Sequence, residues 1–138
     1  MRFLLDTNVL SEPVRGRPDA AILDRLETYA GQIATAAPVW HELWFGCLRL
    51  PDSRRRDFLT DYLGAIYVEL PILDYDARAA EWHARERARL SANGRTPPFV
   101  DGQIAAIAAV NQLTLVSRNV RDFTIFDELR VEDWRTGS

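Results

Sequence analysis

The chain of 138 residues has no lysine, one cysteine and two histidines, and its apolar runs are short. A single cysteine excludes a disulfide framework, and the few histidines beside it do not have the spacing of a zinc site. No apolar stretch approaches the ~18 residues that span a bilayer, and Asp6 interrupts the only N-terminal run that resembles a signal peptide. These absences predict a cytoplasmic protein with no membrane partner.

The net charge of −3 gives the chain no overall attraction for nucleic acid. All 17 basic residues are arginines, which either reflects the composition of the genome or suits phosphate recognition. With 47% hydrophobic residues, the chain is long enough to bury a sizeable core. We therefore expect a single domain over residues 1–138.

Apolar periodicity and the positions of proline and glycine predict alternating strands and helices. Strands are expected at residues 3–5, 33–35, 66–70, 114–117 and 129–132. Helices are expected at residues 18–29, 38–49, 52–63, 74–92 and 101–111. In the fourth helix, Ala77, Ala80, Ala84 and Ala88 form a face suited to close packing, and Gly94 is its stop. This alternation predicts an α/β domain with a mainly parallel sheet, whose sites collect beyond the carboxyl ends of the strands.

Three acidic residues stand out by their positions. Asp6 directly follows the first strand, where it either starts a turn or belongs to a site. Glu42 lies on a helix that is apolar around most of its circumference, so we expect partial burial that requires a cation, a donor or a proton; the alternative is an ion pair with Arg49. Asp101 precedes an Ile- and Ala-rich helix, either as its N-cap or with an oxygen free for a ligand.

Asn119 and Asp122 follow the fourth predicted strand, and they share one face if this segment forms a helical turn. Otherwise Asp122 is a solvated loop acid. Asp6 and Asn119 are expected at the same edge of the sheet. Two carboxylates 4 Å apart repel by about 1 kcal/mol in water and about 4 kcal/mol at an effective dielectric of 20, so converging acids need a counter-ion. Oxygen ligands without Cys or His point to Mg²⁺ or Mn²⁺.

These residues, in this order, resemble a PIN domain, and more specifically a FitB-like, VapC-type ribonuclease toxin of type II toxin–antitoxin systems. The similarity is carried by FLLDTNVLSEP at residues 3–13, Glu42-Leu43 followed by Gly46, Asp101 before Ile104-Ala105-Ala106, and SRNVRDF at residues 117–123. It runs along nearly the whole chain, and its first and last stretches are the most specific.

The resemblance implies a three-layer sandwich around a central, mainly parallel five-stranded sheet. It also implies an Mg²⁺- or Mn²⁺-dependent endoribonuclease that cleaves RNA with metal-activated water. The acidic site of the family falls on Asp6, Glu42 and Asp101 as metal ligands. Its fourth catalytic position, often an Asp, falls on Asn119, which leaves open whether Asp122 completes the site and how many metals bind.

The resemblance further implies a cognate VapB-like antitoxin that blocks the site, a homodimer, a larger hetero-oligomer with the antitoxin, and contact with DNA only through the antitoxin. Asn8 falls on the polar residue expected to orient the first Asp. The candidate RNA contacts are Arg15, Arg17, Arg95 and Arg118, whereas Arg54-Arg55-Arg56 reads as a solvated helix face. Two other functions remain open: a PIN-like module that binds RNA or protein without cleaving, and another metal-dependent phosphotransfer or phosphatase domain.

Overall fold

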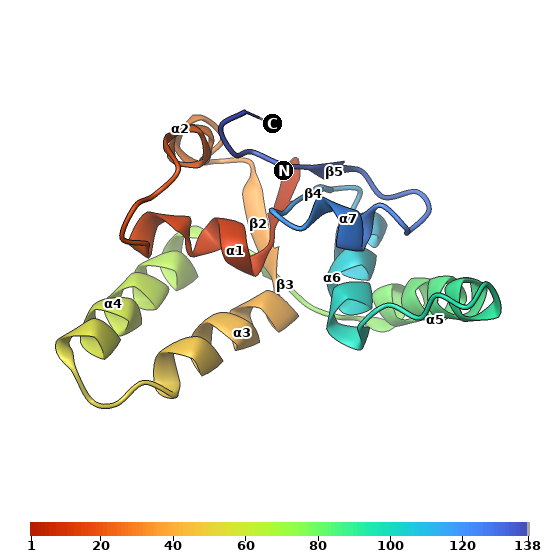
Figure 1. Cartoon of the computed structure of the whole chain (residues 1–138), viewed down its shortest axis with the longest axis horizontal. Helices are drawn as coiled ribbons and strands as arrows, with labels where there is room; N and C mark the ends of the chain where they lie inside the picture. The colour runs from red at the N-terminus through yellow and green to blue at the C-terminus, as the bar shows by residue number, and fades with distance from the viewer. Residues whose placement is uncertain (138) are drawn as a thin grey trace.

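The computed structural model describes residues 1–137 and has a five-stranded sheet between helices (Figure 1). The strands are β1 (Phe3–Leu5), β2 (Ile33–Ala36), β3 (Ile72–Leu73), β4 (Thr114–Val116) and β5 (Val131–Glu132), in the order β3-β2-β1-β4-β5. All the pairings are parallel, and Leu5 lies opposite Thr35 in β2 and Val116 in β4. The predicted α/β fold with a parallel five-stranded sheet is confirmed.

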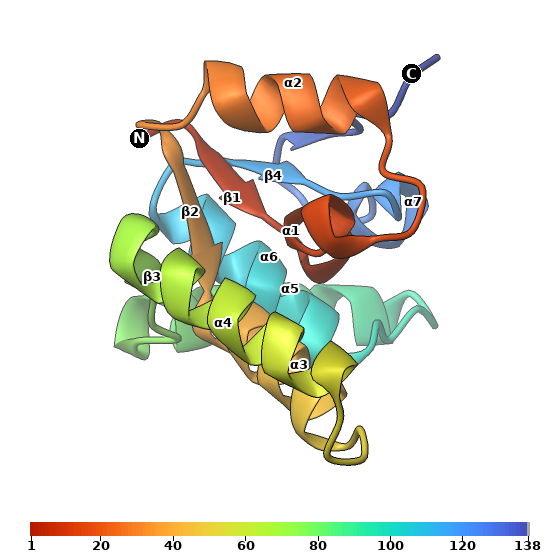
Figure 2. The ribbon, with the colours of Figure 1, turned by 90° about the vertical axis from the view of Figure 1, so that its left-hand side faces the viewer.

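Helices cover both faces of this sheet, with α2 and α4 on one side and α5 and α6 on the other (Figures 1 and 2). They are α1 (Thr7–Leu10), α2 (Ala20–Thr28), α3 (Ala37–Leu48), α4 (Arg54–Glu69), α5 (Ala77–Ala92), α6 (Phe99–Val110) and α7 (Val120–Phe123), with a 3-10 turn η1 at Glu12–Val14. Asp19, Ser53 and Asp76 cap α2, α4 and α5, because their side chains accept hydrogen bonds from first-turn N–H groups. No helix within residues 1–137 is both long enough and apolar enough to span a membrane.

The strand predicted at residues 66–70 is wrong, because most of this segment forms the last turn of α4. Leu63 and Ile66 are buried three residues apart, whereas Tyr67 and Val68 are exposed. This is the spacing of a helix that packs on one face and not the alternation of a strand. The strand that pairs with β2 begins after Pro71, as β3.

The buried face of α5 differs from the predicted one. It consists of Ala79, His83, Glu86 and Leu90, whereas Ala84 and Ala88 of the expected packing face are exposed. The predicted stop is confirmed: Gly94 has φ of 72° and donates its N–H to the Ser91 carbonyl at 3.0 Å.

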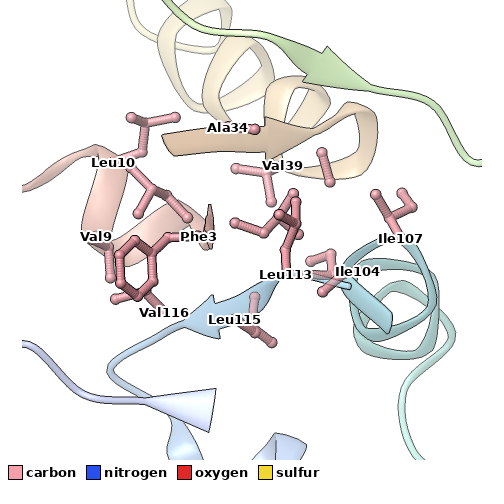
Figure 3. Close-up of a cluster of buried hydrophobic side chains, with 14 of the residues drawn as sticks. Phe3, Val9, Leu10, Ala34, Val39, Ile104, Ile107, Leu113, Leu115 and Val116 are labelled. Carbon is pink, nitrogen blue, oxygen red and sulfur yellow. The ribbon is translucent and has the colours of Figure 1, made fainter. Parts of the chain in front are cut away.

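The core lies between the central strands and the surrounding helices (Figure 3). Side chains of β1 and β4, including Phe3 and Leu115, pack together with Val39 of α3 and with Ile104 and Ile107 of α6. Because both faces of the sheet are covered, its central strands are continuous apolar runs. This packing fixes the start of α6 close to the carboxyl ends of β1 and β4.

The order of the strands reverses direction between β1 and β4, which makes this point a topological switch. β1 leads into α1 and β4 leads toward α7 at the same edge of the sheet (Figure 2). The two ends of the chain also meet: the Trp134 ring lies 5.0 Å from the Phe3 ring and 5.6 Å from the Tyr29 ring. The carboxyl edge itself is where α1 and α7, which are distant in sequence, converge.

Candidate functional site

Asp6 lies directly after β1 and is 6% exposed. Its Oδ1 accepts a hydrogen bond from the Thr7 backbone N–H at 2.8 Å and caps α1, and its Oδ2 accepts one from the Ser117 hydroxyl at 2.7 Å. Burial raises the pKa of Asp6 above its ordinary value, although both hydrogen bonds lower it, and the charge of Asp122 adds to the rise. Asp6 thus starts a turn and also presents a carboxylate with a fixed orientation.

Ser117 connects Asp6 to the segment that follows β4. The Ser117 side chain is fully buried, and its hydroxyl accepts a hydrogen bond from the Asn119 backbone N–H at 2.9 Å while it donates to Asp6. Asn8 accepts a hydrogen bond from the Arg118 N–H at 3.2 Å, which ties the same segment to α1. Sequence reasoning missed Ser117, although its position directly after β4 matches that of Asp6 after β1.

Asp101 lies in the first turn of α6. The N-cap of this helix is Pro98, so the N-cap role considered for Asp101 is wrong: the helix begins earlier, directly after the proline. The pKa of Asp101 is raised to about 6. The largest cause is burial of the side chain, and the negative charges of Asp6 and Asp122 contribute the rest. These acids are therefore close enough to repel one another.

Asn119 and Asp122 lie at the start of α7, and the Asp122 N–H donates to the Asn119 carbonyl at 3.0 Å. The helical turn considered from the sequence forms, with Asn119 as its N-cap, but of these two side chains only Asn119 lines the pocket. The Asn119 side chain faces the same pocket as Asp6 and Asp101, whereas Asp122 is exposed and acts on both through its charge.

The predicted partial burial of Glu42 is wrong, because its side chain is 44% exposed. An apolar surrounding on α3 does not imply burial here, since the neighbouring Phe45 is itself 54% exposed. Glu42 Oε1 lies 3.9 Å from His41 Nδ1. The Arg49 guanidinium lies over the Phe45 ring at 5.8 Å, so the alternative ion pair between Glu42 and Arg49 is not formed.

One pocket of about 490 Å³ brings most of these residues together. Its polar lining includes Asp6, Asn8, Arg15, Glu42, Asp101 and Asn119. Within residues 1–137, no three His, Cys, Asp or Glu side chains gather closely enough to hold a metal ion. The donor chemistry nevertheless fits a hard divalent cation, because carboxylate and amide oxygens line the pocket and the exposed Glu42 is free to change its rotamer.

The four candidate RNA contacts differ in their surroundings. Arg15 lines the pocket and Arg118 follows Ser117, while Arg17 and Arg95 are exposed and lie outside the pocket lining. Glu12, which sequence reasoning missed, is buried and pairs with both Arg15 and Arg118. No sequence pattern signals this role, because a glutamate in a short loop normally faces solvent.

Comparison with known proteins places this geometry in a family. The model of the family described as PIN domain matches residues 3–129. The chain is 32% identical over 135 residues to Ribonuclease VapC2 of Haemophilus influenzae, covering 97% of this chain and 98% of that protein. It is 31% identical over 141 residues to Toxin FitB of Neisseria gonorrhoeae, covering 96% and 98%. The crystal structure of DNA-bound VapBC from Salmonella typhimurium superimposes with a TM-score of 0.86 at 27% identity, covering 97% and 98% of the two chains. The chain belongs to the PIN-domain family.

Proposed function

We propose that this chain is a divalent-metal-dependent endoribonuclease that acts as the toxin of a type II, VapBC-like toxin–antitoxin pair. Nucleases of the PIN-domain family generally depend on divalent metals, and full-length relatives are named as a VapC ribonuclease and as the toxin FitB. The observation that carries the proposal is the pocket that Asp6, Glu42, Asp101 and Asn119 line at one edge of the sheet, where the negative charges of Asp6 and Asp122 repel that of Asp101. Such repulsion destabilises the fold, and a bound cation relieves it.

We assign Asp6, Glu42 and Asp101 as the metal ligands, with Asn119 as the fourth member of the catalytic set. When bound, a divalent metal in such a site activates water and neutralises phosphodiester charge. The hydrogen bond from Ser117 keeps Asp6 in one orientation, so this ligand needs no rearrangement. Asp101, with a pKa of about 6, is mostly ionised at neutral pH and is then able to act as a ligand.

The metal that we propose is Mg²⁺ or Mn²⁺. The support is chemical: the donors are carboxylate and amide oxygens, which these ions prefer over softer metals. Asn119 lines the pocket and Asp122 does not, which favours Asn119 as the fourth group. Asn119 supplies an amide oxygen without charge, and Asp122 then contributes only a long-range field.

The proposed partners are RNA as substrate and a VapB-like antitoxin that covers the site and carries any contact with DNA. The solved VapBC relative is a DNA-bound complex. An apolar pocket of about 250 Å³ adjoins the acidic one and shares Arg15 and Glu42 with it, which offers the antitoxin a surface beside the acids. Exposed apolar side chains support a homodimer and a larger hetero-oligomer with the antitoxin; they are Phe45, Leu48, Phe58, Tyr67 and Val68.

The proposal has two further parts, a single PIN domain over residues 1–138 and a cytoplasmic location. Ser138 lies outside the residues that the structure describes. The first is supported by the family match over residues 3–129 and by a sheet that joins both ends of the chain. The second is supported by the unpaired, buried Cys47, which is typical of a reducing compartment.

A second candidate is a PIN-like module that binds RNA or a protein without cleavage. Two observations favour it. Asn119 brings no negative charge, and within the described part of the chain no three acidic, histidine or cysteine side chains gather closely enough for a metal.

The test is cleavage of a labelled RNA by the wild type, by Asp101→Ala and by the control Asp24→Ala, each in Mg²⁺, Mn²⁺ or EDTA. Asp24 is an exposed acid of α2 outside the pocket, so its substitution removes the same charge away from the site. We expect wild type and control to cleave only with metal, and Asp101→Ala to lose about 100-fold or more in rate. Cleavage that survives EDTA, or equal cleavage by Asp101→Ala, contradicts the metal–acid mechanism. Binding without cleavage by the wild type supports the second candidate.

A further inference from the structure

Glu12 is a buried carboxylate that joins two arginines. It lies in η1 and is 2% exposed, and its Oε1 accepts a hydrogen bond from the Asp19 backbone N–H at 2.8 Å. Its Oε2 lies 3.3 Å from Arg118 Nη1 and 3.6 Å from Arg15 Nη1. Burial of a carboxylate is unfavourable unless cations and donors surround it, and Glu12 has both.

One carboxylate between two guanidinium groups leaves this cluster with a net positive charge. Arg15 is 46% exposed and lines the acidic pocket, and Arg118 is 26% exposed and adjoins Ser117. The Arg118 carbonyl also accepts a hydrogen bond from Arg135 Nη2 at 3.3 Å. Both guanidinium groups are therefore held in place and still reach solvent beside the acidic site.

We propose that Glu12 is a positioning residue that holds Arg15 and Arg118 as a phosphate-binding pair for the RNA backbone beside the site of cleavage. This inference rests on the proposed function and specifies how the substrate is held. A guanidinium matches phosphate geometry, and prior anchoring lowers the entropy that binding costs. Within residues 1–137, no ion pair anchors Arg17 or Arg95 in this way.

Glu12→Gln separates positioning from simple electrostatics, because the two effects have opposite signs. The substitution removes one negative charge, so overall attraction alone predicts tighter RNA binding. Positioning predicts weaker binding. Each phosphate contact on a single strand contributes about 0.7 to the slope of log K against log salt concentration. One contact therefore raises the binding constant about fourfold when the salt concentration falls from 1 M to 0.15 M. Loss of one or both contacts is thus expected to weaken binding by about 4- to 14-fold.

The chain offers a matched control in Glu86. Glu86 is also buried, pairs with Arg89 at 2.9 Å and accepts the Asp127 N–H at 2.6 Å, but it lies outside the lining of the acidic pocket. The probe is a fluorescent single-stranded RNA, whose anisotropy is measured over a salt series in EDTA to prevent cleavage. Glu86→Gln is expected to leave affinity unchanged or slightly raised.

The Arg15→Ala/Arg118→Ala double variant completes the test. Its salt slope is expected to be shallower by about 1.4, and adding Glu12→Gln to it is expected to change affinity no further. Glu12→Gln binding as tightly as the wild type, or an additive loss in the triple variant, refutes the positioning role.

The single variants Arg15→Ala and Arg118→Ala test the proposal if Glu12→Gln does not fold. Both side chains are partly exposed, so their removal is expected to leave the fold intact. Each is expected to lose about fourfold in affinity and about 0.7 in slope; unchanged values refute the pair. Wild-type protein that neither binds nor cleaves RNA overturns the proposed function itself, whereas normal cleavage with an unaffected Glu12→Gln variant overturns this inference alone.

Discussion

Gly102 is the residue at which a single added methyl group tests the placement of Asp101. A Cβ atom on Gly102 would lie 2.1 Å from His83 Nε2 and 2.5 Å from His83 Cδ2, where ordinary contacts are about 3.5 Å. His83 has little room to move, because it is 2% exposed and its Nδ1 lies 2.8 Å from the Tyr75 hydroxyl. Gly102→Ala therefore has to separate α5 from the start of α6 by about 1 Å.

The expected cost follows from this overlap. Overpacking of a core by one methyl group costs about 1–3 kcal/mol in the free energy of unfolding. The displacement falls on the residue after Asp101, and a misplacement of about 1 Å in a catalytic group lowers activity about 100-fold. Gly102→Ala is thus expected to affect cleavage more strongly than its loss of stability alone explains.

The assay combines urea unfolding with RNA cleavage in Mg²⁺. His83→Ala leaves a cavity and is destabilising alone, but Gly102→Ala/His83→Ala is expected to be about 1–3 kcal/mol more stable than the sum of the two effects predicts. Gly64→Ala is the control, because a Cβ there meets nothing within 4 Å, and it is expected to stabilise α4 by about 0.4–1 kcal/mol. Gly102→Ala with wild-type stability and activity, or additive effects in the double variant, refutes the reasoning.

Three other predictions concern the acids. The pKa of Asp101 is raised from 3.8 to about 6, so the stability that its protonated form contributes is full below pH 4 and is lost as the pH rises through 6. Asp101→Asn keeps the side chain neutral and is therefore expected to raise the thermal midpoint in EDTA at pH 7. A lowered midpoint contradicts this. Ser117→Ala removes the hydrogen bond to Asp6 and is expected to weaken metal binding 10- to 100-fold in calorimetry; unchanged affinity argues against an orienting role. Asn119→Ala is expected to retain more cleavage activity than Asp6→Ala, because a neutral ligand contributes less to metal affinity, and the reverse order would show that the ligands are ranked wrongly.

The sequence predicts features of this fold that depend on local pattern and on strand direction. Asp6 and Asn119 follow β1 and β4, and parallel strands bring such residues to one edge. Gly94 ends α5 because a left-handed residue suits a helix stop. These inferences require no knowledge of tertiary partners.

The features that sequence reasoning missed depend on tertiary contacts that residue type and local periodicity do not specify, and several of these contacts join residues distant in the chain. The buried face of α5 includes Glu86, which accepts hydrogen bonds from Arg89 and from the Asp127 N–H. It also includes His83, whose Nδ1 lies 2.8 Å from the Tyr75 hydroxyl, while its Nε2 has no hydrogen-bond partner among the described residues. Residue type alone predicts the alanine face instead. Glu42 was expected to be partly buried because its helix is apolar, but other apolar side chains of α3 are exposed as well. Glu12 and Ser117 take their roles from contacts across more than 100 residues.

The central position of β1 has a consequence for biosynthesis. This strand leaves the ribosome before its neighbours β2 and β4, but the hydroxyl that orients Asp6 belongs to Ser117, 111 positions later in the chain. A nascent chain that stops before β4 carries Asp6, Glu42 and Asp101 but lacks the neighbouring strand and the serine that fixes the first acid. Translation products that stop before Ser117 are therefore expected not to cleave RNA, because the proposed nuclease site is complete only after β4 and Ser117 have been translated.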